Sequence, residues 1–260
     1  MNETTLKKSL AKINLGGLRY FDSIGSTNDE ALAWAASGAK DFSIVIADEQ
    51  TRGRGRLHRT WHTPKGSALA ISLILRPDKL ISAHLSRTVG LAALSIFDST
   101  LTLGLAPHIK WPNDILLNKK KVVGILVESV WSGSEVDSLV IGMGINVYKT
   151  STPPVDSLKF PATSIEDELG KKPPPREEIL RDILLALISW REKITSSEFI
   201  KTWEERLAFR GEQVNIVSGG ETSISGILDG LETDGSLRLR DEDDKSVIVR
   251  FGDVSLRPTA

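Results

Sequence analysis

The sequence lacks cysteine altogether and has no long apolar run. Without thiols, the chain cannot use disulfide frameworks, thiolate nucleophiles or cysteine-ligated zinc. Of its four histidines only His58 and His62 are four positions apart, and they lie in an Arg- and Gly-rich segment and not in a predicted helix, so they do not predict a histidine metal site, and no metal ligands are identified. The longest apolar run lies within Ile179–Trp190 and is interrupted by Arg181 and Asp182, which makes it far too short to cross a bilayer.

The sequence also has no large surplus of positive or of negative charge. The formal net charge is −1 and the pI is about 6.5, whereas dedicated nucleic-acid binders usually carry a clear basic surplus. The N-terminal segment is polar and lacks the apolar core of a signal peptide. A chain of 260 residues, 40% hydrophobic and 26% charged, is typical of a soluble globular protein with one or two domains. We therefore expect a cytoplasmic protein that binds neither nucleic acid nor membrane.

The first 208 residues combine β-rich runs with amphipathic helices. Strands are predicted over Leu18–Asp22, Phe42–Ala47, Ala68–Leu75, Ile109–Trp111, Ile115–Asn118, Lys121–Val130 and Val136–Val147. A helix is predicted to start after Thr27, with Thr27 as its cap and Glu30 in the capping-box position, to run through Ala36 and to stop at Gly38. Further helices are predicted over His84–Leu103, Arg176–Lys193 and Ser196–Phe209. Because strands and helices do not alternate strictly, the pattern favours an α+β domain with a mixed or antiparallel sheet.

The remaining chain, residues 209–260, has a different pattern. Short β-like runs alternate with Gly and Asp turns over Gln213–Val217, Ser223–Leu228, Leu237–Arg240 and Val247–Phe251. This pattern predicts a small separate β-barrel after the first domain. Between the predicted strand Val136–Val147 and the predicted helix Arg176–Lys193, the proline-broken stretch Ser151–Pro161 is predicted to be a surface loop.

The segment Gln50–Trp61 places four arginines and two glycines within eight positions after a predicted strand. Glycine lets backbone N–H groups approach a phosphate, and arginine pairs with phosphate oxygens in a bidentate way. The GxxxxGK[ST] pattern of a P-loop is absent, so any nucleotide is held differently. Taken alone, the segment is equally compatible with a solvated basic loop, and nucleic-acid binding is a third reading.

Three further segments carry candidate binding groups. Lys110–Asp114 is a bend, because Pro112 cannot donate to a strand ladder, and bends that present Asn and Asp often face ligands. Lys119–Glu128 and Ile141–Val147 place glycines inside strands, which a flat ligand close to the backbone would require. Read singly, these segments are also explained by a surface ion pair, a solvated lysine turn and a β-bulge.

Together and in this order, the segments resemble the motif series of biotin–protein ligases. The resemblance rests on Ser26-Thr27-Asn28, Gln50, Gly53-Arg54-Gly55-Arg56, Lys110-Trp111-Pro112-Asn113-Asp114, Lys121, Gly124-Ile125-Leu126-Val127-Glu128 and Gly142-Met143-Gly144-Ile145-Asn146. It runs from about Leu18 to Asn146 and resumes at Gly211–Val214 and Gly252–Arg257.

This resemblance implies both a fold and a reaction. The fold is the biotin–lipoate ligase catalytic domain, which is similar to class II aminoacyl-tRNA synthetases, followed by an SH3-like barrel. The reaction joins biotin to ATP as biotinyl-adenylate with release of pyrophosphate, and then transfers biotin to a lysine of a biotin carboxyl carrier protein. Concentrated Arg and Lys charge suits the phosphoryl transfer, and magnesium (Mg2+) is expected on the ATP phosphates.

By position, the resemblance also implies residue roles. Biotin contacts are expected from Ser26, Thr27, Gln50, Gly53, Arg54, Lys121, Gly124, Gly142 and Gly144. ATP and adenylate contacts are expected from Arg54, Arg56, Arg59, Trp61, Asn113, Lys121, Asn146 and Arg257, with Trp61 stacked on adenine. Catalytic roles are expected for Arg56, Lys110, Asp114 and Lys121, where Lys121 bridges the biotin carboxylate and the α-phosphate and Asp114 receives the acceptor lysine.

Two departures from the family pattern matter. The family commonly has glycine where this chain has His58, and a non-glycine residue is expected to restrict the backbone there to ordinary φ values. Too few residues precede the first predicted strand for a helix-turn-helix domain, so we expect a ligase without a repressor function. The Arg52–Arg59 loop, with like charges beside glycines, is expected to become ordered only when an anion binds.

Alternatives from other classes stay open. A lipoate–protein ligase has a similar fold and chemistry, but the Gly-Arg-Gly-Arg loop and the Gly142–Asn146 segment favour biotin. A non-catalytic biotin or nucleotide sensor would be expected to have lost Lys121, Arg56 or Asp114, which are all present. A homodimer through exposed edge strands is compatible with the sequence, although the sequence does not identify those strands.

Overall fold

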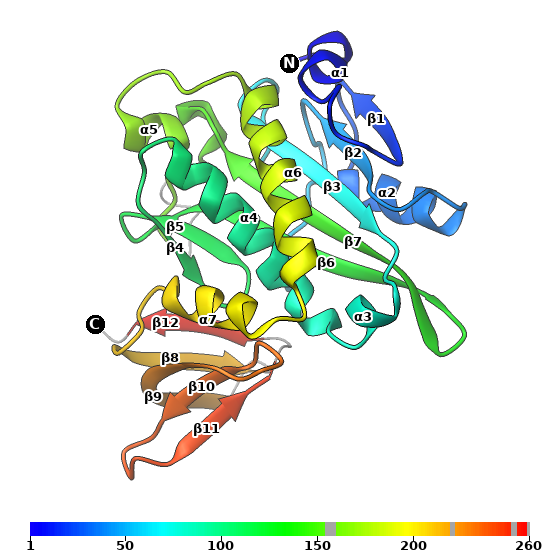
Figure 1. The fold of residues 1–260 in the computed structure, drawn as a ribbon. Helices are drawn as coiled ribbons and strands as arrows, with labels where there is room; N and C mark the ends of the chain where they lie inside the picture. The colour runs from blue at the N-terminus through cyan, green and yellow to red at the C-terminus, as the bar shows by residue number, and fades with distance from the viewer. Residues whose placement is uncertain (154–159, 219–221, 251–253, 259–260) are drawn as a thin grey trace.

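The computed structural model describes residues 1–153, 160–218, 222–250 and 254–258, which form two sheets (Figure 1). The larger sheet has the order β1-β2-β3-β7-β6-β5-β4. Its strands are β1 Gly17–Phe21, β2 Ser43–Ala47, β3 Ala68–Leu75, β4 Pro107–Lys110, β5 Asp114–Leu117, β6 Lys120–Ser132 and β7 Glu135–Asn146. Strands β1 and β2 pair in parallel and the other neighbours pair antiparallel, which confirms the predicted mixed sheet.

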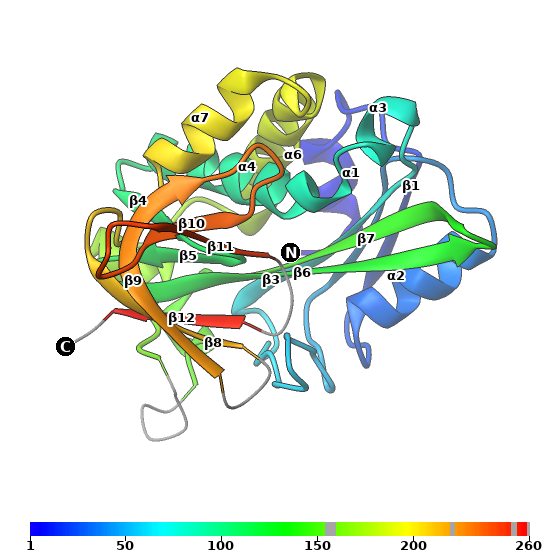
Figure 2. The same cartoon turned by 90° about the horizontal axis from the view of Figure 1, so that it is seen from below.

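Helices cover both faces of this sheet. They are α1 Glu3–Ser9, α2 Thr27–Ala36, α3 Lys79–Ser82, α4 Thr88–Thr102, α5 Ile165–Leu169, α6 Arg176–Lys193 and α7 Ser197–Glu205, with 3₁₀ turns at Leu85–Arg87 and Lys149–Ser151. Figures 1 and 2 show α4 and α6 on one face and α2 on the other. Among the described residues, no helix is long and apolar enough to span a membrane.

Burial on both faces explains the sequence of the central strand. Every residue of β3 is buried, which is why Ala68–Leu75 reads as a continuous apolar run and not as an alternating one. Helix α6 contributes Ile179, Leu180, Ile183 and Leu184 at i, i+3 and i+4 spacing, and all four are buried. Each such side chain stabilises the fold by about 1.5–3 kcal/mol when fully removed from water.

The start of helix α2 differs from the sequence prediction. The N-cap of α2 is Ser26, so the prediction of Thr27 as the cap is wrong. The Thr27 hydroxyl instead lies against the Gln50 side chain, because α2 begins at the wall of a cavity. The predicted helix His84–Leu103 is divided into a 3₁₀ turn and α4, and α1 and α5 were not predicted because they are short and mostly polar.

The smaller sheet has the order β11-β10-β9-β8-β12 and is antiparallel throughout. Its strands are β8 Gln213–Ser218, β9 Thr222–Leu231, β10 Leu237–Arg240, β11 Ser246–Val249 and β12 Val254–Pro258. This confirms the predicted small all-β unit, while its boundary at residue 209 stays a prediction. Phe251 and the Gly252-Asp253 part of the closing motif lie outside the described residues.

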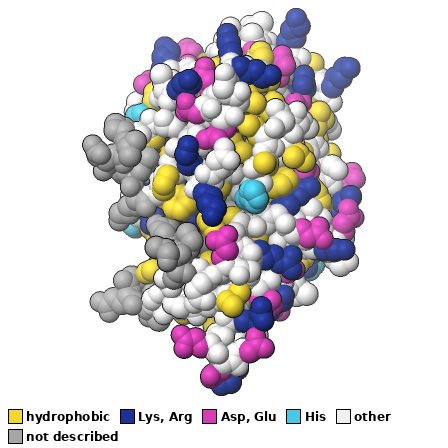
Figure 3. Space-filling model, turned by 90° about the vertical axis from the view of Figure 1, so that its left-hand side faces the viewer, with side chains coloured by type: hydrophobic (Ala, Val, Ile, Leu, Met, Phe, Trp, Pro, Cys, Tyr) yellow, Lys and Arg dark blue, Asp and Glu magenta, His cyan; other side chains and the backbone are white. Residues whose placement is uncertain are grey.

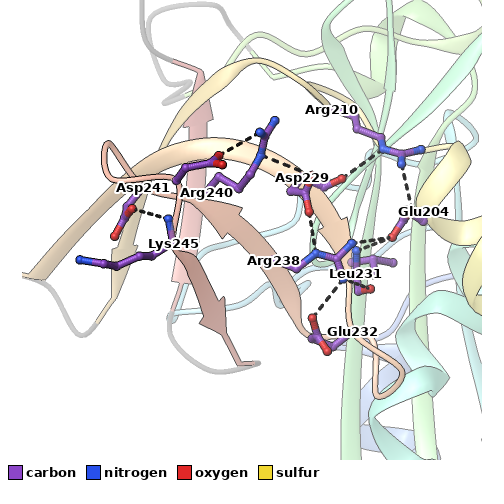
Figure 4. Close-up of polar contacts among 10 residues, drawn as sticks. Glu204, Arg210, Asp229, Leu231, Glu232, Arg238, Arg240, Asp241 and Lys245 are labelled. Carbon is purple, nitrogen blue, oxygen red and sulfur yellow. Dashed lines mark hydrogen bonds and ion pairs between the residues drawn. The ribbon is translucent and has the colours of Figure 1, made fainter.

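Charged side chains join this sheet to α7. Glu204 of α7 accepts hydrogen bonds from the Leu231 backbone N–H at 2.7 Å and from Arg210 at 2.9 Å. Figure 4 shows Arg238 beside it, paired with Asp229 at 2.7 Å. The carboxylate of Glu204 thus holds one end of β9 to the last helix of the preceding unit.

A second connection runs through the turn between β9 and β10. Three consecutive backbone carbonyls of this turn accept hydrogen bonds from side chains of the larger unit. The pairs are Arg87 with Thr233 (2.6 and 2.9 Å), Ser86 with Asp234 (2.7 Å) and Trp111 with Gly235 (3.0 Å). Because Trp111 lies inside the Lys110–Asp114 bend, the small sheet contacts the segment that carries the candidate catalytic groups.

Candidate active site

A cavity of about 600 Å3 is lined by residues of α2 and of the large sheet. The predicted site residues that line it are Ser26, Thr27, Gln50, Arg54, Arg56, Arg59, Trp61, Lys110, Asn113, Asp114, Lys121, Gly124, Gly142, Gly144 and Asn146. Gly53 is outside the lining, where an added Cβ would be 2.4 Å from the Trp61 carbonyl oxygen. The side chain of Arg257 lies outside the described part of the structure. Segments far apart in sequence therefore converge on one cavity.

The charge of the lining is strongly basic. Among the described lining residues, Arg54, Arg56, Arg59, Lys110 and Lys121 are cationic at neutral pH, whereas Asp114 is the single carboxylate. Positive groups in a partly closed cavity favour an anionic ligand, because the low dielectric of the walls weakens screening. The cavity is suited to a polyphosphate and a second anion together.

Asp114 is the centre of a lysine–carboxylate cluster. Its carboxylate lies 2.7 Å from the Lys121 Nζ and 3.6 Å from the Lys110 Nζ, and all three residues line the cavity. Burial acts to raise the pKa of Asp114, but the two ammonium groups outweigh this effect and hold the pKa below its usual value. Asp114 is therefore a stable anion that orients two cations toward the cavity.

The local fold explains why these groups meet. The bend Trp111–Asn113 joins β4 to β5 so that Lys110 and Asp114 are direct cross-strand partners. The next strand, β6, is paired with β5 and brings Lys121 to the same carboxylate. The spacing of Lys110 and Asp114 can be read from the sequence, whereas the position of Lys121 depends on the register shift between β5 and β6.

Glycines on β6 and β7 make room for the Trp61 ring. A Cβ on Gly144 would be 2.3 Å from the indole, and a Cβ on Gly124 would be 2.8 Å from it. The Trp61 Nε1 is buried and has no hydrogen-bond partner among the described residues, and the Lys121 Nζ lies 5.4 Å from the ring centroid. Trp61 thus covers the glycine wall, and its expected stacking on adenine stays a prediction.

The arginine loop is attached to the sheet by ion pairs. Arg54 forms a bidentate pair with Glu128 at 2.7 and 3.0 Å and also contacts Asp29 at 2.8 Å. Arg56 donates to the Asn113 side chain at 3.1 Å, which links the loop to the Lys110–Asp114 bend. These contacts place both guanidinium groups at the rim of the cavity.

His58 does not follow the backbone expectation. Its φ is +56°, and that of the preceding Leu57 is +57°, so both adopt the left-handed conformation. The prediction that a non-glycine residue restricts this position to ordinary φ values is therefore wrong. The loop reverses direction here, as the hydrogen bond from the Gly55 N–H to the Arg59 carbonyl shows, and the turn imposes the conformation.

Sequence reasoning missed two parts of the wall. Phe160, inside the predicted surface loop, and Ala162, just after it, line the cavity because backbone hydrogen bonds join Pro161 and Thr163 to Lys121. Asn28 also lines it and contacts Gly142, where a Cβ would be 2.2 Å from the Asn28 Oδ1. The signal for Asn28 was its place beside Ser26 and Thr27, whereas the loop contact had no local signal.

The fold and this cavity can be compared with known proteins. Residues 20–146 match the Biotin/lipoate A/B protein ligase family, and residues 209–257 match the Biotin protein ligase C terminal domain. The chain is 37% identical over 232 residues to the biotin–[acetyl-CoA-carboxylase] ligase of Paracoccus denitrificans. This match covers 86% of this chain and 94% of that protein. The chain therefore belongs to the biotin protein ligase family.

Other relatives differ in length. The chain is 41% identical over 168 residues to the bifunctional ligase/repressor BirA of Bacillus spizizenii, and the match spans 65% of this chain and only 51%, about half, of that relative. Among solved structures, the biotin protein ligase of Aquifex aeolicus in complex with biotin and ATP superposes with a TM-score of 0.80 at 29% identity. That match covers 94% of this chain and 99% of the other.

Proposed function

We propose that this protein activates biotin with ATP to form biotinyl-5'-AMP and then transfers biotin to a lysine of a biotin carboxyl carrier protein. The observation that carries the proposal is the Asp114 cluster. It presents the Lys110 and Lys121 ammonium groups to a cavity that three loop arginines also line. This arrangement suits a reaction in which two anions must be brought together.

The proposed binding roles divide the lining into two ends. The ureido ring of biotin contacts Ser26, Thr27 and Gln50, and its bicycle packs against Gly124, Gly142 and Gly144. Arg54, Arg56, Arg59, Asn113, Asn146 and Arg257 hold the nucleotide, with Gly53 supporting the loop backbone and Trp61 stacking on adenine. The complex of the Aquifex aeolicus relative with biotin and ATP supports a cavity that accepts both substrates.

In the first step, a carboxylate oxygen of biotin attacks the α-phosphorus of ATP, and the bond to the leaving pyrophosphate breaks. Lys121 and Arg56 neutralise the charge that accumulates on the phosphoryl oxygens. In the second step, the acceptor amine attacks the acyl carbon, AMP leaves, and the amine loses a proton. The low pKa of Asp114 makes it a weak base, so its role is to orient Lys110 and Lys121 and to attract the acceptor ammonium group.

Magnesium would enter with the ATP phosphates. Among the described residues, no group of three or more His, Asp or Glu side chains could hold a metal ion. The one carboxylate among the described lining residues, Asp114, is paired with two lysines. Mg2+ usually keeps several waters and binds through substrate phosphates, so a dedicated protein site is not required. Its role would be to neutralise the phosphates.

The remaining partners are proposed from the surface charge and from the relatives. Figure 3 shows one face of the molecule, on which basic and acidic side chains are interspersed, and this supports a protein that does not bind nucleic acid. The carrier protein as acceptor follows from the names of the relatives, such as the acetyl-CoA-carboxylase ligase of Paracoccus denitrificans. A homodimer and a cytoplasmic location stay predictions.

Pyrophosphate release tests the proposal directly. Purified protein is mixed with ATP and magnesium and given biotin in one reaction and lipoate in another. Release that depends on biotin alone is expected. Release with lipoate alone would assign the protein to the lipoate–protein ligases, and no release with either acid would leave the non-catalytic sensor as the better reading.

A further inference from the structure

Four polar side chains, three of them buried and the fourth, Gln50, half-buried, form a chain beside the Thr27 end of the cavity. Ser72 Oγ on β3 is completely buried and lies 2.5 Å from Asn28 Oδ1 and 2.9 Å from Thr27 Oγ1. Thr27 Oγ1 in turn lies 3.0 Å from Gln50 Oε1. All three distances are hydrogen-bond distances between two oxygen atoms, so each contact needs a proton between its oxygens.

The orientation of both amides is determined by their other partners. The Asn28 Nδ2 faces the Glu128 carboxylate at 2.8 Å, and a carboxylate only accepts, so the Asn28 oxygen must face Ser72. Gln50 Oε1 accepts the Thr27 backbone N–H at 2.8 Å, and Gln50 Nε2 donates to Thr63 at 3.1 Å. Both amides therefore present oxygen, an acceptor, to the hydroxyl groups.

The oxygen–oxygen contacts of this chain outnumber its hydroxyl protons. Ser72 and Thr27 each supply one hydroxyl proton, whereas the chain has three oxygen–oxygen contacts. One contact is left with two acceptors facing each other. A buried acceptor without a donor is costly, so this chain is stabilised by any ligand that brings an N–H group to Thr27 or Gln50, which both line the cavity.

The same geometry provides one donor. Gln50 Nε2 carries two protons and uses one on Thr63, which leaves the second for a ligand carbonyl. An acceptor-rich Thr27 next to a donating Gln50 is complementary to a group that has an N–H beside a C=O. A urea has this pattern, whereas a dithiolane has neither group.

We propose that Ser72, Asn28 and Glu128 are positioning residues that create this proton shortage and thereby make the site select a cyclic urea. The inference rests on the proposed biotin activation and explains which atoms give it specificity. Glu128 acts at a distance: it orients Asn28, Asn28 takes the Ser72 proton, and Thr27 is left to accept from the ligand.

The test compares biotin with an analogue in which one ureido N–H is replaced by a ring oxygen, each regioisomer in turn. The full chain is assayed for pyrophosphate release, and the ratio of kcat/KM for biotin to that for the analogue is measured. In the unmodified protein we expect a ratio of at least about tenfold for one regioisomer. A ratio near one for both regioisomers would overturn the inference. Absence of biotin-dependent release would instead overturn the proposed function.

Glu128→Gln is the most informative variant because it removes no atom from the chain of oxygens. The new amide can donate to Asn28, so Asn28 can rotate and present its N–H groups to Ser72. Three contacts then have three protons, and we expect the biotin-to-analogue ratio to fall at least about threefold. An unchanged ratio in a protein that still adenylates biotin would overturn the inference.

Asp29→Asn is the matched control for Glu128→Gln. Asp29 also pairs with Arg54, at 2.8 Å. Among the described residues, its carboxylate forms no hydrogen bond with the Asn28 side chain. Any effect that comes from loosening Arg54 should appear in both variants, whereas the loss of discrimination should appear only in Glu128→Gln. Equal losses in both would assign discrimination to Arg54 and overturn the inference.

A second variant, Ser72→Ala, tests the inference independently if Glu128→Gln does not fold. Ser72→Ala leaves one contact at the ligand end, Thr27 with Gln50, and one proton for it, so the shortage disappears there, while Asn28 Oδ1 loses its donor away from the ligand. We expect the ratio to fall while the KM for ATP stays within about twofold, because Ser72 does not line the cavity. Ser95→Ala is the control, since Ser95 is equally buried but bonds to its own helix at Leu91. A preserved ratio in Ser72→Ala would overturn the inference.

Discussion

The indole N–H of Trp111 donates a hydrogen bond of 3.0 Å to the backbone carbonyl of Gly235, which joins the Lys110–Asp114 bend to a turn of the C-terminal sheet. Trp111 is buried, and its chain neighbour Lys110 belongs to the Asp114 cluster. The small sheet therefore supports the site from outside the cavity. In this arrangement a change in the C-terminal sheet can alter the geometry of Lys110.

Trp111→Phe tests this support. An aromatic ring is kept, but the N–H and part of the buried side-chain volume are lost. The Gly235 carbonyl then loses its donor, and we expect the free energy of unfolding to fall by roughly 1–3 kcal/mol. Adenylation should fall as well, because Lys110 shifts with the bend. Ser86→Ala is the control, since it removes a hydrogen bond to the next carbonyl without touching the cavity. Equal losses of activity in both variants would argue against a specific link through Trp111.

Asp114→Asn should lower both stability and activity. Loss of the carboxylate leaves Lys110 and Lys121 without their shared counterion, which costs roughly 3 kcal/mol for a buried group. We expect biotin-dependent pyrophosphate release to fall by about 100-fold, as for loss of a preorganised electrostatic contact. Unchanged release would show that the lysines keep their positions without Asp114.

The stability difference between the unmodified protein and Asp114→Asn should depend on pH. The native pKa of Asp114 is lowered, so the native state favours the ionised form more than the unfolded chain does. The stabilisation is complete above the unfolded pKa of about 3.9 and is lost as pH falls through the lower native pKa. Urea unfolding between pH 7 and acid pH would measure it, and a difference that grows toward low pH would contradict the assignment.

Gly142→Ala should weaken biotin binding through Asn28. The new Cβ would lie 2.2 Å from the Asn28 Oδ1, so the amide must move away from Ser72. We expect the KM for biotin to rise by about tenfold or more, with a loss of roughly 1–3 kcal/mol in the free energy of unfolding. Steady-state kinetics with biotin varied at saturating ATP would measure this, and an unchanged KM would contradict the role of Asn28.

His58→Gly should relieve backbone strain in the arginine loop. The left-handed conformation costs a non-glycine residue roughly 1–2 kcal/mol, and glycine adopts it freely. Because glycine also gains entropy in the unfolded chain, we expect a net increase in the free energy of unfolding of roughly 0.5–1 kcal/mol. Leu57→Gly, at almost the same φ, should behave similarly. A decrease in both variants would contradict the strain.

Hydrogen exchange tests the loop itself. We expect the backbone amides of residues 52–59 to exchange more slowly when biotin and ATP are both present, because an anion neutralises the arginines and lets the loop close. The ion pairs of Arg54 with Glu128 and Asp29 are expected to be exchanged for contacts with the ligand. Slow exchange before ligand is added would contradict this prediction.

Local sequence patterns were sufficient for most of the fold. The apolar run of β3 and the apolar periodicity of α6 come from burial that each element requires, so both could be predicted within a few residues. The short helix α1 could not, because its signal is a single capping box at Asn2 and Thr5 in a polar segment. The left-handed φ of His58 could not either, since the turn around it determines that conformation.

The sequence by itself determined the reactive groups and the glycines beside them, because the Lys110–Asp114 spacing, the arginine loop and the strand glycines are local and read together. Tertiary structure alone decided which of these groups share a partner. Lys121 reaches Asp114 through strand register, Asn28 reaches Ser72 across 44 positions, and Trp111 reaches Gly235 across 124. Contacts between distant segments depend on packing and hydrogen-bond geometry, and no local pattern encodes them.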